Sequence, residues 1–222
     1  MAPAVSASVS ASVSASAFAR SAVIALHYQN DVLDPGGQIR VGFDAVQPER
    51  AAVLDAARAL LAAARRHALP LLHIRIAFRH DYADLLRNAP IFVRTAEAGA
   101  LREGTWGAQF YPGLEPDDTR ALDYVLHHRR TSGFIGTPLE QILAAHDVRH
   151  LIVAGVATHS TVEMTVRHAV DLGYTATVAA DACSCADRRA HDASLEAMRL
   201  IAEISTVADI FGAPHSSDKD HE

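Results

Sequence analysis

Three short segments of the chain combine imidazoles, hydroxyls and carboxylates in a way that suits proton transfer. They span residues 27–31, 127–134 and 155–161, and each begins where an apolar run ends. A histidine has an unperturbed pKa of about 6.5, so it takes or gives a proton at neutral pH. A threonine hydroxyl has a far higher pKa and needs a positioned base before it can attack a substrate. The residue types in these segments therefore suggest acid–base chemistry on a small molecule.

Short apolar runs alternate with helical patterns, and these elements must position the three segments. Strands are predicted at residues 22–26, 71–78, 122–126, 150–154 and 176–180, with a sixth at 205–207. Helices are predicted at residues 48–67, from 137 onward, at 159–172 and at 187–203.

Strands that are apolar along their length and separated by helices predict a parallel sheet covered on both faces. The expected fold is therefore α/β, a three-layer α/β/α arrangement with a doubly wound, six-stranded, mostly parallel sheet. In such folds ligands bind beyond the carboxyl ends of the strands, where the three segments fall. Residues 79–119 are rich in loop signals, which is typical of a binding loop or lid.

The composition indicates one globular domain with two short extensions. The chain has 222 residues, of which 50% are hydrophobic and 21% charged, and this is enough to bury a core. Residues 1–20, rich in alanine, serine and valine, predict a flexible arm. Residues 21–212 form the predicted domain, and residues 213–222 a polar tail.

The net charge and the cysteine content indicate which binding partners and which cellular compartment to expect. The formal net charge of -6 provides no basic field for nucleic acid, and no apolar run is long enough to cross a membrane. We therefore expect a small-molecule substrate. Cys183 and Cys185 are too close in sequence for an ordinary disulfide, which favours a reduced, cytoplasmic protein.

Four stretches carry a resemblance to a known family. They are LHYQND at 26–31, EGTWG at 103–107, HRRTSGFIGTPL at 128–139 and GVATHST at 155–161. In this order they resemble the motifs of the isochorismatase-like hydrolases, the superfamily of nicotinamidase, N-carbamoylsarcosine amidohydrolase and isochorismatase. The resemblance implies the fold predicted above, hydrolysis of a small molecule and assembly into a homo-oligomer. A single lysine beside much alanine and arginine is typical of a GC-rich genome and fits specialised metabolism.

The resemblance also indicates that the amidase triad has changed. The family's amidases use an aspartate, a lysine and a cysteine, and these positions fall on His27, His128 and Thr161. The only lysine is Lys219 in the polar tail, and we expect the two cysteines, which follow the next strand, not to reach the helix start at Thr161. The prediction is a cysteine-independent hydrolase or related lyase. His27 and His128 would transfer protons, and Thr161 would help to stabilise negative charge.

Three alternatives remain open at this point. Isochorismatase itself cleaves a vinyl ether without a cysteine and resembles this chain at His159 and at the Trp106-Gly107 pair. A second alternative is a catalytic metal held by His27, His128 and His159, since three imidazoles with an open position describe a zinc site; otherwise no cofactor is expected. The third is an inactive homologue that binds a small molecule without converting it.

The resemblance also suggests pocket residues and local structure. The predicted substrate-binding residues are Trp106, Phe78, Phe134, Tyr111, His159 and Ser160. Ser160 with Glu163 has the pattern of a capping box, and Arg79 and Arg130 are expected to pair with carboxylates. The turn at residues 155–158 resembles one that holds a cis peptide before a residue other than proline.

Overall fold

The computed structural model describes residues 18–39 and 49–212. The predicted arm as far as residue 17 and the predicted tail at 213–222 lie outside the described residues. No helix in the described part combines the length and apolar character needed to cross a membrane.

A six-stranded parallel sheet forms the centre of the molecule, as predicted. The strand order is β3-β2-β1-β4-β5-β6, and every neighbouring pair is parallel. The strands are β1 (Ser21–Leu26), β2 (Leu71–Ile76), β3 (Asp123–His128), β4 (His150–Gly155), β5 (Thr175–Ala179) and β6 (Glu203–Ser205).

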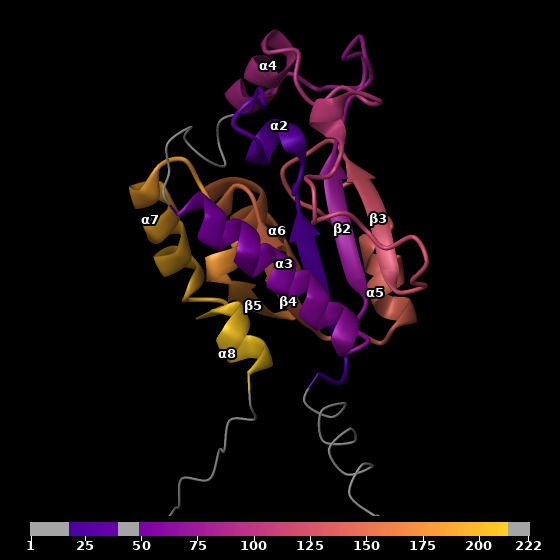
Figure 1. Ribbon diagram of the computed structural model, residues 1–222, viewed down its shortest axis with the longest axis vertical. Coiled ribbons are helices and arrows are strands. Elements are labelled where there is room, and N and C mark those ends of the chain that lie inside the picture. Colours follow the sequence, from indigo (N-terminus) through magenta and orange to yellow (C-terminus); the bar gives the residue numbers. More distant parts are fainter. Residues whose placement is uncertain (1–17, 40–48, 213–222) are drawn as a thin grey trace, which may run out of the picture.

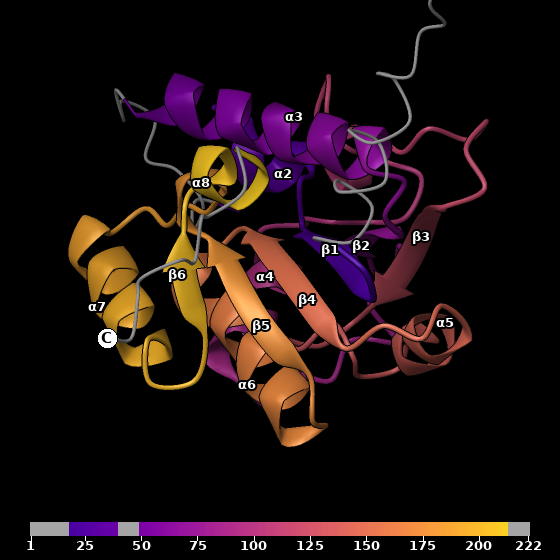
Figure 2. The ribbon, with the colours of Figure 1, turned by 90° about the horizontal axis from the view of Figure 1, so that it is seen from below.

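Helices cover both faces of this sheet, which gives the predicted three layers. Helices α3 and α8 lie on one face, and α5 and α6 lie on the other (Figure 2). Helix α7 packs beside α6 and β6, while α2 and α4 lie beyond the carboxyl ends of the strands (Figure 1). The helices are α2 (Asn30–Leu33), α3 (Arg50–Arg66), α4 (Pro90–Glu97), α5 (Leu139–Ala145), α6 (Glu163–Asp171), α7 (Arg188–Met198) and α8 (Val207–Phe211).

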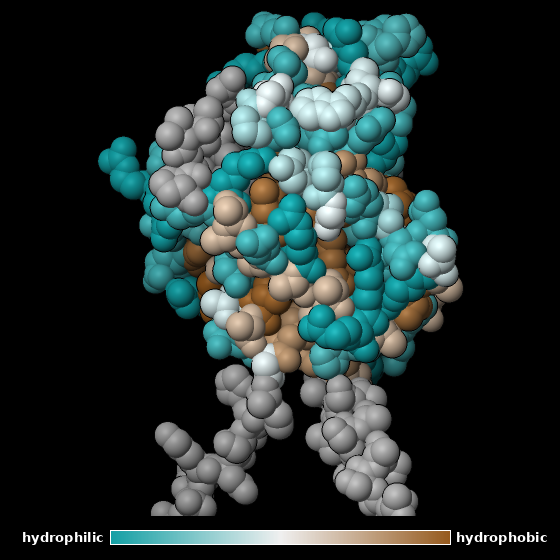
Figure 3. Space-filling model, viewed as in Figure 1, coloured by the Kyte–Doolittle hydropathy of each residue, from teal (hydrophilic) through white to brown (hydrophobic). Residues whose placement is uncertain are grey.

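The core follows from the two-sided burial of the central strands. All six residues of β1 are buried, because this strand has neighbours on both edges and helices on both faces. The edge strand β3 is only partly buried, and Val125 within it is 49% exposed. On the face that carries α3, apolar side chains gather over the lower half and the upper part is mostly hydrophilic (Figure 3).

Several element boundaries differ from the prediction. The stretch at 79–119 contains a helix, α4, whose single strong signal is Pro90 at its first position. Helix α7 ends at Met198 rather than at residue 203, and β6 begins at Glu203. The five-residue helix α8 replaces the end of the predicted sixth strand. It was not predicted because five residues are too few to display a periodic pattern.

Candidate active site

The segments predicted to carry chemistry meet at the carboxyl ends of β1 and β4. The chain leaves β1 toward β2 and β3 on one side, and β4 leads to β5 and β6 on the other. Such a reversal of strand order opens a crevice in which ligands bind. Leu26 and Gly155, the last residues of the two strands, are register partners, so the residues that follow them start side by side.

A hydrogen-bonded pair of imidazoles occupies this crevice. His27 follows β1 directly and has a left-handed conformation, with φ of 56°, and its Nε2 lies 2.5 Å from Nε2 of His128. His128 Nδ1 lies 3.1 Å from the Ser132 carbonyl oxygen, which can only accept a proton. His128 therefore carries its proton on Nδ1 when neutral, so His27 donates from Nε2 to the free Nε2 of His128.

Both imidazoles are held in the neutral form. Burial lowers the pKa of His27 well below its usual value, and the neighbouring His128 lowers it further. Burial also lowers the pKa of His128 to about 4. A charged imidazole is poorly solvated here, and the carboxylate that would stabilise it is absent from the residues facing this pair in the described structure. Both rings are therefore unprotonated at neutral pH, and each keeps one nitrogen lone pair.

His27 and Thr161 line one small cavity of about 50 Å³. Its wall is largely apolar, with contributions from α2, β2, α4 and the turn after β4. Thr161 is 2% exposed, and its hydroxyl has no hydrogen-bond partner among the described residues. Burying a hydroxyl without a hydrogen-bond partner destabilises the folded protein, so this hydroxyl is available to a ligand. The other lining residues are Val32, Ile39, Ile76, Ile91, Phe92, Thr95, Leu101, Arg130, Thr131, Val156, Ala157 and Ser160.

A wider cavity of about 630 Å³ lies outside the small one. The two share Ile39, Ile91, Thr95 and Ser160, so the outer cavity forms the mouth of the inner one. Two of these residues come from α4, which means that the stretch predicted as a binding loop does supply part of the wall. His159 lines the mouth.

The turn after β4 positions Thr161 and Ser160. Its peptide bond between Val156 and Ala157 is cis, as the resemblance implied. A wide π-helical turn at Thr158–Val162 then leads into α6. The predicted capping box is absent: no side chain caps this helix start, and Glu163 bonds instead to Arg167 and Ser194.

Four aromatic residues predicted to bind substrate are not among the described residues that line either cavity. Phe78 is buried and packs against Tyr82, and Phe134 packs against His168. The hydroxyl of Tyr111 accepts a hydrogen bond from Arg50. Trp106 is 50% exposed. These rings were predicted to lie near the site because they are close to its motifs in sequence. Three of them are instead held by contacts elsewhere, and Trp106 faces solvent.

The expectation that neither cysteine reaches the helix start is wrong for Cys185. A bridge between Val156 and Ser184 brings the segment after β5 against the turn after β4. Cys185 Sγ consequently lies 2.8 Å from His159 Nδ1. Neither cysteine lines the His27 cavity in the described structure.

The alternative three-histidine metal set is not assembled. His27 and His128 are together, but His159 bonds to Cys185 instead. The described residues contain no group of three or more histidines, cysteines or carboxylates placed to hold a metal ion.

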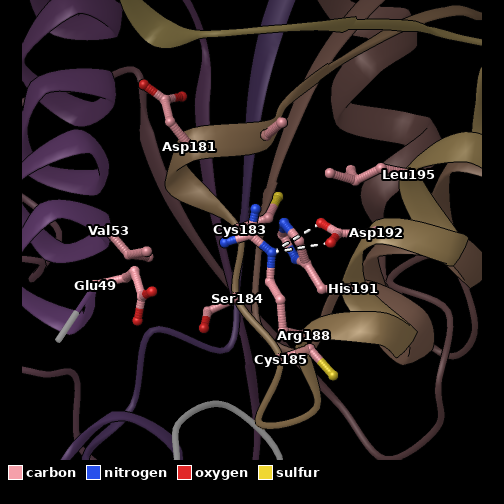
Figure 4. A pocket seen from close by; sticks show the side chains of 11 residues that line it. Glu49, Val53, Asp181, Cys183, Ser184, Cys185, Arg188, His191, Asp192 and Leu195 are labelled. Carbon is pink, nitrogen blue, oxygen red and sulfur yellow. Dashed lines mark hydrogen bonds and ion pairs between the residues drawn. The ribbon is translucent and has the colours of Figure 1, made fainter. Parts of the chain in front are cut away.

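A separate cleft of about 300 Å³ opens between α3 and α7 (Figure 4). Both cysteines line it, and Arg188 there pairs with Asp192. His191 lines this cleft and hydrogen-bonds to Thr158 in the turn after β4. The cleft therefore touches the turn that carries Thr161 from behind, while His27 lines the other cavity.

Comparisons with known proteins agree with the fold. A family model described as Isochorismatase domain matches residues 21–209. The chain is 30% identical over 176 residues to the ureidoacrylate amidohydrolase RutB of Cronobacter sakazakii, with 73% of this chain and 74% of that protein covered.

Solved structures show the same fold. A cysteine hydrolase from Pseudomonas syringae pv. phaseolicola superposes with a TM-score of 0.75 at 24% identity, over 86% of this chain and 91% of that chain. An N-carbamoylsarcosine amidase from Thermoplasma acidophilum gives a TM-score of 0.66 at 22% identity, over 85% and 96% of the two chains.

Proposed function

This chain belongs to the isochorismatase family of hydrolases, and from that premise we propose that it hydrolyses a small molecule with His27 as general base and without a cysteine nucleophile. The observation that carries the proposal is the buried pair His27–His128, with ring nitrogens 2.5 Å apart, beside the unpartnered hydroxyl of Thr161. The named relatives act on ureidoacrylate and N-carbamoylsarcosine. A small ureido or amide compound is therefore the proposed substrate class.

His27 is the member of the pair that lines the cavity, so it is the proposed catalytic residue. His128 acts through it as a positioning residue. Its Nδ1 is fixed by the Ser132 carbonyl, and its free Nε2 holds the His27 ring by accepting the Nε2 proton. An imidazole that donates from Nε2 has Nδ1 as its acceptor, and a backbone interaction with Val156 raises the pKa of this ring, which favours its protonated form.

The proposed reaction adds water across the scissile bond. His27 accepts one proton from water while the water oxygen bonds to the carbonyl carbon. The carbonyl oxygen becomes an oxyanion, to which the buried Thr161 hydroxyl donates a hydrogen bond. When the oxyanion collapses, the carbon–nitrogen bond breaks and His27 returns its proton to the leaving nitrogen. The histidine therefore ends in the state in which it began.

Both cysteines are poorly suited to act as the nucleophile. Burial raises the pKa of Cys183 to about 12 and raises that of Cys185 as well, so both stay as thiols at neutral pH. A thiol is a far weaker nucleophile than a thiolate. Cys185 is also 4% exposed and lies outside the His27 cavity.

The test is hydrolysis of a panel of small ureido acids, carbamoyl amino acids, amides and vinyl ethers. We expect turnover of at least one ureido or amide compound, with a loss of at least about a hundredfold in His27→Gln. Cys185→Ser is the matched control, because serine preserves a hydrogen bond to His159, and it should retain wild-type turnover. Loss of turnover in Cys185→Ser, or full turnover in a folded His27→Gln protein, would refute the proposal.

A further inference from the structure

One cation in the wall of the His27 cavity has no carboxylate partner among the residues that the structure describes. Arg130 was expected to pair with an acidic side chain, as its counterparts do: Arg79 pairs with Asp81 and Arg129 with Asp84. Among the described residues, none of the ion pairs includes Arg130. Within the described residues, its guanidinium therefore stands in the cavity wall without a carboxylate to balance its charge.

The Arg130 guanidinium is nonetheless fixed in place. Its central carbon lies 4.3 Å from the centre of the Phe92 ring, and Phe92 lines the same cavity. It donates hydrogen bonds to the Asn88 side-chain oxygen at 3.1 Å and, weakly, to the Leu86 carbonyl at 3.5 Å. A guanidinium has five N–H donors, so these two bonds leave donors for a ligand.

The walls around Arg130 carry no negative charge in the part of the chain that the structure describes. Aspartate and glutamate are both absent from the lining of the inner cavity and of its mouth. The mouth instead adds the exposed Arg94. This local excess of positive charge contrasts with the net charge of -6 for the whole chain. Such a cleft attracts anions.

We propose that Arg130 binds a carboxylate group of the substrate, so that the substrate is a small monocarboxylic acid whose reactive carbonyl faces His27. A planar guanidinium matches a carboxylate through two parallel hydrogen bonds. The apolar wall and the cavity volume of about 50 Å³ suit a short carbon chain between the two groups. This carboxylate site rests on the proposed function only for the position of the reactive carbonyl beside His27.

Crotonate and crotonamide are suitable probes, because they share a carbon skeleton and differ in charge. Their dissociation constants are measured by NMR titration of the wild-type protein, Arg130→Gln and Arg129→Gln. We expect crotonate to bind the wild type at least about tenfold more tightly than crotonamide. Arg130→Gln should abolish this preference and leave crotonamide binding unchanged. Arg129→Gln, the matched control one residue away, should retain the preference.

Two results would overturn the carboxylate site. The first is equal affinity for the two probes, or no crotonate binding, in the wild type. The second is an equal loss of both probes in Arg130→Gln, which would assign Arg130 to supporting the Phe92 wall.

Hydrolysis assays separate this proposal from the proposed function. Carboxylic acids in the panel should show a KM raised about tenfold in Arg130→Gln with kcat unchanged, whereas neutral amides should show neither change. Turnover without any preference for acids would overturn the carboxylate site and leave His27 as the base. A crotonate preference without hydrolysis of any compound would overturn the proposed function and leave the carboxylate site standing.

Discussion

Replacing His128 by glutamine should flatten the dependence of folding stability on pH. Glutamine retains an amide donor and an acceptor near the Ser132 carbonyl and His27, but it does not titrate. In the wild type, burial lowers the pKa of His128 from 6.5 to about 4. Between these values the unfolded chain binds a proton at His128 that the folded protein does not, so stability falls as the pH falls.

The size of the effect follows from this pKa shift. The free energy of unfolding contributed by His128 is fully present above pH 6.5 and is lost progressively toward pH 4. Each unit of pKa difference is worth about 1.4 kcal/mol. The wild type should therefore lose about 2 kcal/mol at pH 5 and about 3 kcal/mol below pH 4 through this group, and His128→Gln should be spared that loss.

Urea unfolding at intervals from pH 4 to pH 8, followed by circular dichroism, measures these differences. His80→Gln, at an exposed position, is the matched control for replacing an imidazole by an amide. We expect the wild type to show a steeper slope than His128→Gln by about one proton between pH 4 and pH 6.5. Parallel curves for these two proteins would refute the assignment of a buried, neutral His128.

Three further substitutions test other parts of the structure. Thr161→Val removes a buried hydroxyl that has no described partner. The free energy of unfolding should therefore stay equal or rise by up to about 1 kcal/mol, while turnover falls at least about tenfold. A loss of stability would show that the hydroxyl is already hydrogen-bonded. Gly155→Ala places a Cβ 2.3 Å from the Leu26 carbonyl oxygen at a φ of +146°, and urea unfolding should show a loss of about 3 kcal/mol or more; an unchanged midpoint would contradict the close approach of β1 and β4. Asp123→Asn neutralises a fully buried carboxylate side chain that pairs with Arg65, and the same measurement should show a loss of about 3 kcal/mol; a loss below about 1 kcal/mol would indicate a solvated pair.

The sheet and the convergence of His27 with His128 are predictable from sequence because they depend on regular patterns. The apolar runs at β1 and β4 contain no charged residue. A strand must be free of charged side chains along its whole length only when both faces of the sheet are covered. Parallel strands bring their carboxyl ends to one edge, so residues that directly follow strands meet there. The positions of His27 and His128 beyond β1 and at the end of β3 follow from this rule.

Contacts between irregular segments could not be predicted in the same way. The bond between Cys185 and His159 depends on a single bridge at Val156 and Ser184, and no periodicity marks such a bridge. Phe134 lies within a site motif and Phe78 shortly after β2, but the direction of a side chain in an irregular segment depends on local φ and ψ. Sequence neighbourhood therefore identified Ser160 and His159 in the cavity walls, but the four aromatic residues predicted with them are not among the described lining residues.

The position of Arg130 in the cavity wall was missed for a related reason. An arginine in a surface segment usually finds an acidic partner, and the neighbouring Arg129 does so with Asp84. Arg130 instead stacks on Phe92, which belongs to α4. This eight-residue helix was not predicted, because it shows less than three turns of periodic pattern. Without α4 the sequence offered no indication of where the guanidinium would lie.

The pH profile of kcat/KM for the best substrate of the panel tests the central claim most directly. Catalysis by His27 as general base requires the neutral imidazole, and the pKa of His27 lies well below 6.5 in the folded protein. The value of kcat/KM should therefore stay constant from about pH 8 to about pH 6 and fall with one proton at lower pH. A rate that is halved near pH 6.5, or one that rises with deprotonation of a group above pH 8, would contradict it.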